Sequence, residues 1–306
     1  MQLNGIHHIT AITADAARNL DFYVRVLGLR FVKKTVNFDA PDLYHLYYAD
    51  EFGNPGSIIT FFEYPGAGRG RPGAGMIHRI LWRVRDEHAL GFWEDRLSTE
   101  GVEVSWTNEG LYFSDPEGLG HGLVMDESGD KPLFAQSPDV PPERALVGFA
   151  GVRAYSGARV PTQRMLEDVL GATTVQLGIF EVRGPTRTAF YVIEDAPGRG
   201  IQAAGTVHHI AWACHPDHHI AWRDRLIAAG AGVTDVIDRQ YFRSIYFREP
   251  GGVLFEIATV GPGFTVDEPE ARLGESLKLP PQHEGLRPRL EGSLTPLENP
   301  RRAPSY

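Results

Sequence analysis

Cysteine is almost absent from this sequence, since only one of its 306 residues, Cys214, is a cysteine. One cysteine cannot form a disulfide framework, and it cannot supply the several thiolates of a structural zinc site. Such low cysteine usage is typical of a reducing compartment, so we expect a cytoplasmic protein. Any metal ion that the protein binds should therefore be held by histidine and carboxylate side chains.

Basic residues are also in the minority. The 30 lysines and arginines are outnumbered by 39 aspartates and glutamates, which gives a formal net charge of −9. Because the sequence has no basic run, we expect no nucleic acid partner. It also has no apolar segment near the roughly 20 residues that span a bilayer, and its first residues lack the pattern of a signal peptide. We therefore expect neither secretion nor insertion into a membrane.

What the sequence does contain is a fourfold repeat, whose copies we call modules 1 to 4. Each module opens with a short apolar, strand-like stretch, at 5–10, 76–81, 148–153 and 206–211. A stretch of helical periodicity follows each of them, at 16–27, 87–99, 161–170 and 216–229. After each helix, short runs rich in β-branched and aromatic residues alternate with turn signals. We therefore interpret the repeating unit as βαβββ.

Four βαβββ modules predict an α+β protein in which pairs of modules form two domains with open, concave mixed sheets. We expect modules 1 and 2 to form an N-terminal domain over 1–130, and modules 3 and 4 to form a C-terminal domain over 147–260. The intervening segment 131–146 would be a linker. In the proline-rich C-terminal extension, 261–306, we expect the part from 264 to 279 to dock on the protein, whereas beyond 281 docking and disorder are both compatible with the composition.

Two adjacent histidine pairs occupy the same position in the first strands of modules 1 and 4. The pairs are His7-His8 and His208-His209. Side chains alternate along a strand, so the two members of a pair should point to opposite faces of the sheet. Small residues share a face with His8 and His209, and bulky apolar residues, which should meet the helix, share the other face. We therefore expect His8 and His209 to face a cavity.

A carboxylate, Glu256, interrupts the otherwise apolar last strand of module 4. A buried ionised group is costly unless it is paired or bound to a cation. Two imidazoles and one carboxylate form the facial set typical of non-haem Fe(II), so His8, His209 and Glu256 are candidate ligands, and Mn(II) or Zn(II) would also fit. Each residue taken singly could equally be a hydrogen-bonded core residue. The first strands of modules 2 and 3 carry Arg79 and Gly151 at the ligand position, which confines the expected site to modules 1 and 4.

Several motifs, read in order along the chain, resemble a known family. They are the segments 6–10, 23–35, 44–46, 247–252 and 256–268. The βαβββ repeat with its His-Ile and Leu-Phe-Glu-Ile signatures resembles the vicinal-oxygen-chelate superfamily, which includes glyoxalases and extradiol dioxygenases. More narrowly, the motifs resemble the hydroquinone-type ring-cleaving dioxygenases, in their methylhydroquinone branch.

This resemblance implies Fe(II) held by His8, His209 and Glu256, and an O2-dependent opening of a hydroquinone-type, or catechol-type, aromatic ring. The partners would be a small aromatic substrate and O2, and a homo-oligomer is possible because sheet edges in such modules are often shared. The resemblance also implies catalytic roles for Tyr246, His208 and His7, and substrate-binding roles for Thr10 and Arg239.

The sequence itself supports one of these roles, because a hairpin centred on Gly251 would place Tyr246 opposite Glu256 on the same face. For His7 and Thr10 an ordinary packing role stays open. Arg239 lies in a loop that is shorter than in relatives acting on chlorinated rings.

Two other functions remain open at this point. One is a glyoxalase-like isomerase or lyase with Zn(II) or Ni(II), for which Glu63 is a candidate fourth ligand, although it lies two residues beyond the expected position near Phe61. The other is a metal-free protein of the same fold that binds quinones or a drug.

Overall fold

The four modules share one strand order in the computed structural model, which describes residues 1–301. In every module the first strand pairs in parallel with the fourth, the fourth pairs with the third, and the third pairs with the second. The predicted βαβββ repeat is therefore confirmed.

The elements of each module follow in chain order. Module 1 contains β1 (Ile6–Thr13), α1 (Ala16–Leu20), the π-helix η1 (Asp21–Val26), β2 (Arg30–Asn37), β3 (Ala40–Ala49) and β4 (Ile58–Glu63). Module 2 contains β5 (Met76–Val84), α2 (Glu87–Thr99), β6 (Val104–Trp106), β7 (Leu111–Ser114) and β8 (Gly120–Met125). Module 3 contains β9 (Phe149–Ser156), α3 (Arg159–Arg164), the π-helix η2 (Met165–Val169), β10 (Thr173–Gln176), β11 (Ile179–Arg183) and β12 (Thr188–Asp195).

Module 4 and the C-terminal extension complete the chain. Module 4 contains β13 (Thr206–Cys214), the 3₁₀ turn η3 (Pro216–His218), α4 (His219–Ala228), β14 (Ile237–Asp238), β15 (Arg243–Arg248) and β16 (Leu254–Thr259). The extension contains the 3₁₀ turns η4 (Phe264–Val266), η5 (Glu270–Arg272) and η6 (Pro281–Leu286), followed by α5 (Arg287–Ser293). Among the described residues, no helix combines the length and the apolar character needed to cross a bilayer.

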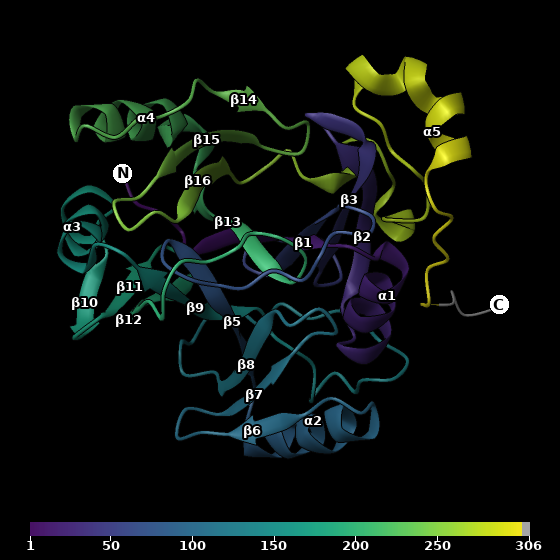
Figure 1. Ribbon diagram of the computed structural model, residues 1–306, viewed down its shortest axis with the longest axis horizontal. Coiled ribbons are helices and arrows are strands. Elements are labelled where there is room, and N and C mark those ends of the chain that lie inside the picture. The colour runs from purple at the N-terminus through teal and green to yellow at the C-terminus, as the bar shows by residue number, and fades with distance from the viewer. Residues whose placement is uncertain (302–306) are drawn as a thin grey trace.

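The two sheets pair module 1 with module 4 and module 2 with module 3. Their strand orders are β14-β15-β16-β13-β1-β4-β3-β2 and β10-β11-β12-β9-β5-β8-β7-β6. The first strands of the paired modules meet antiparallel at the centre of each sheet, as Figure 1 shows for β1 (purple) and β13 (green). The expectation that consecutive modules pair with each other is thus wrong. The repeat predicts that the first strand of each module has one unpaired edge, but it does not predict which strand pairs with that edge. The boundaries 1–130, 131–146 and 147–260 remain a prediction.

The helical segments of the four modules lie within two residues of their predicted ranges, and local sequence signals mark two of their starts and all four of their ends. The side chain of Asp15 caps α1 by accepting a hydrogen bond from the backbone N–H of Arg18, and Asp86 caps α2 through the N–H of Ala89. A glycine with φ between 71° and 82° follows each helical segment, at Gly28, Gly101, Gly171 and Gly230. This left-handed conformation ends a helix without a side-chain clash.

The two faces of the first sheet bury different residues. Ile9, Ile210 and Trp212 point into the main hydrophobic core, and none of them is exposed to solvent. The opposite, concave face carries a second apolar cluster that includes Tyr47 and Phe242. The concave face therefore combines apolar packing with the histidine-bearing positions of β1 and β13.

The extension docks on the outer strands of module 1, and Figure 1 shows α5 beside β3. Phe264 and Leu273 belong to the concave apolar cluster, and Leu290 is fully buried. The hydroxyl of Tyr44 on β3 donates a hydrogen bond to the carbonyl of Thr295 at 2.9 Å. The docking expected for 264–279 is confirmed, and the contacts continue past Leu290. Residues 302–306 lie outside the described part of the chain.

Candidate metal centre

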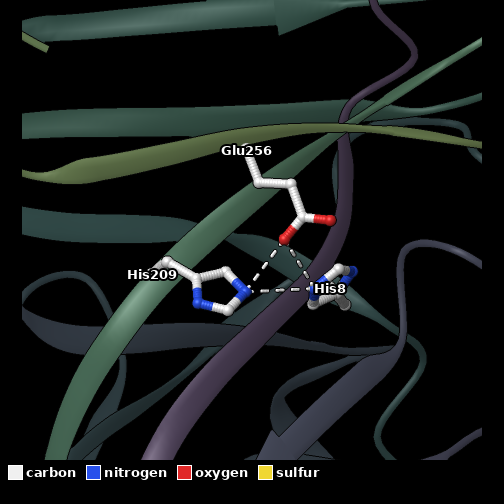
Figure 2. A group of neighbouring side chains, drawn as sticks. All are labelled: His8, His209 and Glu256. Carbon is white, nitrogen blue, oxygen red and sulfur yellow. Dashed lines mark hydrogen bonds and ion pairs between the residues drawn. The ribbon is translucent and has the colours of Figure 1, made fainter. Parts of the chain in front are cut away.

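Three neighbouring strands bring His8, His209 and Glu256 together. Oε2 of Glu256 on β16 lies 2.9 Å from Nε2 of His209 on β13 and 3.3 Å from Nε2 of His8 on β1, and the two Nε2 atoms are 3.3 Å apart (Figure 2). All three side chains are buried. Within residues 1–301, this is the one set of three or more His, Cys, Asp or Glu residues whose ligand atoms lie within 4.8 Å of one another.

The surroundings of Glu256 fit a cation. Its Oε1 accepts a hydrogen bond from the Ser244 hydroxyl at 2.5 Å, whereas its Oε2 accepts none from any described group, although two imidazoles lie beside it. Burial raises the pKa of this carboxyl, but the charge of His8 and the contacts with both imidazoles outweigh burial and hold the pKa of Glu256 well below its ordinary value. An ionised, buried carboxylate with an unsatisfied oxygen is suited to bind a metal ion.

A β-bulge accompanies each candidate ligand histidine. The register between β1 and β13 shifts at His7 and at His208, so each of them is an extra residue in its strand. Such a bulge re-aims side chains. As a result, Nδ1 of His7 lies 2.9 Å from Nδ1 of His8, and Nδ1 of His208 lies 2.8 Å from Nδ1 of His209. The expectation that the members of each pair point to opposite faces is therefore wrong.

The imidazoles beside the candidate ligands are neutral. Burial, followed by the neighbouring imidazole, lowers the pKa of His7 to about 3 and that of His208 to about 3. Burial also lowers the pKa of His209. A neutral histidine that donates its Nδ1–H to a neighbour keeps the Nε2 lone pair free for a metal ion. Each pair can therefore act as one ligand with its supporting acceptor.

A cavity of about 440 Å³ opens beside His8 and His209. Its wall is rich in aromatic and imidazole side chains, including Phe38, His45, Tyr47, Phe62, Phe242 and Tyr246. Arg239 also lines it: Nε of Arg239 donates to the Tyr246 hydroxyl at 3.2 Å, and Nη1 of Arg239 lies 3.1 Å from Oδ2 of Asp39. A flat, mostly apolar ligand with a few polar groups suits such a wall.

The structure separates the five residues expected around the ligands into two groups. Tyr246, His208 and Arg239 line the cavity, and the β15–β16 register places Tyr246 opposite Glu256, which confirms the predicted hairpin register. His7 packs against the ring of Phe242, with centroids 4.9 Å apart. Thr10 is buried, and its hydroxyl accepts a hydrogen bond from Thr60 at 2.9 Å.

Sequence reasoning assigned no site role to His45, Tyr47, Thr60 or Phe242. Three of them line the cavity, and Thr60 contacts both His45 and Thr10. A strand-by-strand comparison of modules 1 and 4 would have drawn attention to His45, Tyr47 and Thr60, because their positions correspond to those around Glu256. For Phe242, which lies in the loop before β15, we see no comparable signal.

In the second sheet, other residue types stand at the positions that correspond to His8 and His209. Arg79 stands at the position of His8 and lies 4.1 Å above the ring of Tyr112. Gly151 stands at the position of His209, where a Cβ atom would lie 2.2 Å from the carbonyl oxygen of Phe190. No larger side chain fits there without movement of the backbone, so a matching centre cannot form from these residues.

Comparison with known proteins identifies the family. Residues 5–120 and 147–257 match the model of the Glyoxalase/Bleomycin resistance protein/Dioxygenase superfamily. The chain belongs to this superfamily. The two matched segments extend over parts of all four modules, ending at the start of β8 and within β16, and they contain each of the three candidate ligands.

Two relatives in the superfamily are similar over almost their whole length. MhqO from Bacillus subtilis (strain 168), whose name provisionally assigns it as a ring-cleaving dioxygenase, is 41% identical over 303 residues, which are 96% of this chain and 96% of that protein. Chlorohydroquinone/hydroquinone 1,2-dioxygenase from Sphingobium indicum is 34% identical over 308 residues, covering 94% of this chain and 95% of that protein. The resemblance inferred from the motifs is confirmed.

Solved structures of the superfamily agree with the fold. The crystal structure of a provisionally assigned dioxygenase from Bacillus subtilis has a TM-score of 0.91 and 40% identity, covering 97% of this chain and 98% of that chain. Glyoxalase I from Zea mays has a TM-score of 0.60 at 13% identity, covering 88% of this chain and 96% of that chain. The second likeness shows that the fold is shared.

Proposed function

We propose that this protein is an Fe(II)-dependent dioxygenase that uses O2 to open hydroquinone-type, or catechol-type, aromatic rings. The observation that carries the proposal is the convergence of His8, His209 and Glu256 beside an aromatic-lined cavity. Two histidines and one carboxylate are the ligand set of many non-haem Fe(II) oxygenases, and Mn(II) is the second candidate ion. The names of the Bacillus and Sphingobium relatives support the same reaction class.

His8, His209 and Glu256 would hold the metal, and Fe(II) bound there would supply the Lewis-acid and redox chemistry that a phenolic ring and O2 require. The protein would contribute the orientation of the ring and the placement of protons. Phe62 and Phe242 border the cavity and would hold the ring by its faces and edges.

Tyr246 would act as a hydrogen-bond donor to a substrate oxygen. Because Nε–H of Arg239 donates to the Tyr246 oxygen, the tyrosine's own hydrogen stays available to the cavity. Burial, and then the nearby charge of Glu256, raise the pKa of Tyr246. The phenol would therefore remain protonated through the reaction's working pH range.

His208 would present a second donor. If Nε2 of His209 binds the metal, its hydrogen sits on Nδ1 and is donated to Nδ1 of His208, 2.8 Å away. The hydrogen of neutral His208 then sits on Nε2. Since His208 lines the cavity, this N–H can reach a hydroxyl or carbonyl oxygen of the substrate.

Oxygen consumption tests the proposal directly. We expect protein reconstituted anaerobically with Fe(II) to consume O2 when hydroquinone, methylhydroquinone or catechol is added, as measured with an oxygen electrode. No uptake with any of the three would reject the dioxygenase. Isomerisation of a hemithioacetal by Zn(II)- or Ni(II)-loaded protein would favour the glyoxalase-like alternative instead.

The ligand set is tested by Glu256→Ala. This change should remove iron from the purified protein and abolish O2 uptake, because two imidazoles alone hold Fe(II) weakly. Metal content is measured by elemental analysis. Glu194→Ala on β12 of the second sheet is the matched control, since Glu194 pairs with His78 and Arg153 and should leave iron content unchanged. Retention of iron and turnover by Glu256→Ala would overturn the assignment.

The contacts of Glu63 argue against a fourth carboxylate ligand. Its Oε1 accepts a hydrogen bond from the backbone N–H of Ala16 at 3.0 Å, at the start of α1. In the strand register, the residue of module 1 that corresponds to Glu256 is Thr60, which has no carboxylate.

A further inference from the structure

Modules 1 and 4 can be compared residue by residue around the candidate metal centre. Thr10 and Ala211 each stand two residues after a candidate ligand histidine. In the parallel pairs of the sheet, Thr10 lies opposite Thr60, and Ala211 lies opposite Glu256. Thr60 of module 1 therefore occupies the position that the carboxylate ligand occupies in module 4.

The next strand of each module continues the correspondence. Tyr47 lies opposite Thr60, as Tyr246 lies opposite Glu256. Two residues earlier, on the same face, stand His45 in module 1 and Ser244 in module 4. The Ser244 hydroxyl donates to Glu256, and correspondingly Nε2 of His45 lies 2.8 Å from Oγ1 of Thr60. Module 1 thus holds a neutral hydrogen-bonded pair where module 4 holds a carboxylate and its donor.

This pair belongs to a chain of four side chains. The Tyr47 hydroxyl lies 2.9 Å from Nδ1 of His45, Nε2 of His45 contacts Thr60, and the Thr60 hydroxyl donates to Oγ1 of Thr10 at 2.9 Å. Tyr47, Thr60 and Thr10 are buried and His45 is partly buried, with Tyr47 and His45 bordering the cavity. The chain therefore runs from the substrate cavity to the strand that carries His8.

The direction of every bond in this chain follows from the donor count. Thr60 has one hydroxyl hydrogen and gives it to Thr10, so it must accept the Nε2–H of His45. Burial, and then the charges of the neighbouring histidines, lower the pKa of His45 well below its ordinary value, so the imidazole is neutral. Its Nδ1 then carries a lone pair and accepts the O–H of Tyr47.

These bond directions determine whether each end of the hydrogen-bonded chain can donate or accept a further hydrogen bond. Thr10 already accepts a hydrogen bond, and among residues 1–301 no group accepts its own hydroxyl hydrogen, which stays available on the face of β1 that carries His8. Tyr47 has its hydrogen engaged, so it offers the cavity only lone pairs. One end can donate to an oxygen at the metal centre, and the other can accept from a hydroxyl group of a ligand.

We propose that His45 and Thr60 are positioning residues that keep the Thr10 hydroxyl a donor toward oxygen at the metal centre and the Tyr47 hydroxyl an acceptor for a substrate hydroxyl. The inference rests on the proposed dioxygenase function. In this proposal, Tyr47 accepts a hydrogen bond from the second hydroxyl of a dihydroxylated ring. Thr10 acts as a hydrogen-bond donor although it does not line the cavity.

The tautomer of His45 tests the chain without reference to turnover. In the full-length protein loaded with diamagnetic Zn(II) and labelled with ¹⁵N-histidine, we expect His45 to show a protonated Nε2 and an unprotonated Nδ1 at neutral pH. The signal is assigned by its loss in His45→Gln. A protonated Nδ1, or a doubly protonated ring, would overturn the proposal.

Kinetics of Thr60 variants test the positioning role. Thr60→Val keeps the side-chain shape but breaks the chain, and we expect kcat for hydroquinone to fall about tenfold with unchanged iron content. Thr60→Ser, which keeps the hydroxyl, should restore most of the loss. Thr35→Val is the control, because the buried Thr35 hydroxyl has no partner among the described residues.

The two tests separate the two proposals. A wild-type level of kcat in Thr60→Val, in an enzyme whose wild type consumes O2, would reject the positioning role. If the wild type consumes no O2, the dioxygenase function fails, and the tautomer measurement still decides whether the chain has the stated direction.

Discussion

Burial lowers the pKa of several histidines in this protein, because it penalises the charged form of the ring. His121 on β8 shows this away from the metal centre. Nε1–H of Trp82 donates to its Nδ1 at 3.1 Å, so its own hydrogen sits on Nε2, 3.0 Å from the Tyr23 hydroxyl. Tyr23 in turn donates to Asp115. Burial, and then the charge of Arg79, lower the pKa of His121 to about 3.

A neutral His121 predicts a loss of stability in mild acid. The unfolded residue takes up a proton near its ordinary pKa of 6.5, and the folded residue only near about 3. The unfolding free energy therefore has its full value above pH 6.5 and decreases as the pH falls below 6.5. His121→Gln keeps a donor and an acceptor but does not titrate. We expect it to flatten the pH dependence of the unfolding free energy, between pH 6.5 and roughly pH 5, by about 1.4 kcal/mol per pH unit. Denaturant titrations across this range measure the slope, and an unchanged slope would contradict the neutral ring.

Both sheets contain β-bulges between their two central strands, and the second sheet also contains a close backbone contact. The register between paired first strands shifts at His7 and His208 in the first sheet, and at His78 and Ala150 in the second. The bulges therefore belong to the repeat and do not depend on metal ligands. In the first sheet they let adjacent histidines contact each other, whereas in the second the backbone closes tightly at Gly151.

Gly151→Ala should destabilise the second sheet strongly. A Cβ atom there would lie 2.2 Å from the Phe190 carbonyl oxygen, and backbone atoms of the adjacent β12 cannot move aside as a flexible side chain could. We expect a loss of about 2 to 3 kcal/mol in unfolding free energy, as for other overpacked sites. Equilibrium denaturation measures the loss. Gly91→Ala in α2, where no atom lies within 4 Å of the added Cβ, should instead stabilise the protein slightly, and equal effects of the two changes would contradict the steric argument.

At the level of the whole molecule, the C-terminal extension packs against module 1, behind residues that line the cavity. The fully buried Lys33 on β2 fastens it, because Nζ lies 2.6 Å from Oδ1 of Asp267 and 2.5 Å from Oε2 of Glu268. Phe264 of the extension packs against the rings of Tyr47 and Tyr241, both at 5.2 Å. The extension therefore supports a residue that lines the cavity, although it begins after the last strand.

Lys33→Met should loosen the extension. It leaves the buried Glu268 carboxylate without its cation, which typically costs about 3 to 5 kcal/mol. We expect lower thermal stability and faster hydrogen exchange over 264–279, measured by mass spectrometry. Lys34→Met is the control, because Lys34 makes no ion pair with any described residue and its backbone carbonyl would still accept the N–H of Lys278. Unchanged exchange in Lys33→Met would show that apolar contacts alone hold the extension.

The amino-acid sequence by itself determined the βαβββ repeat, the helix ends, the opposition of Tyr246 and Glu256, and the choice of His8, His209 and Glu256 as candidates. These depend on patterns within one or two neighbouring elements, such as alternation, helix-ending glycines and hairpin register. Only the tertiary structure decided that module 4 completes the sheet of module 1 and that Thr60 takes the place of a carboxylate. Both facts depend on which strands pair along their unpaired edges, and the paired strands β1 and β13 are some 200 residues apart in the chain. No local sequence pattern specifies a pairing over such a distance.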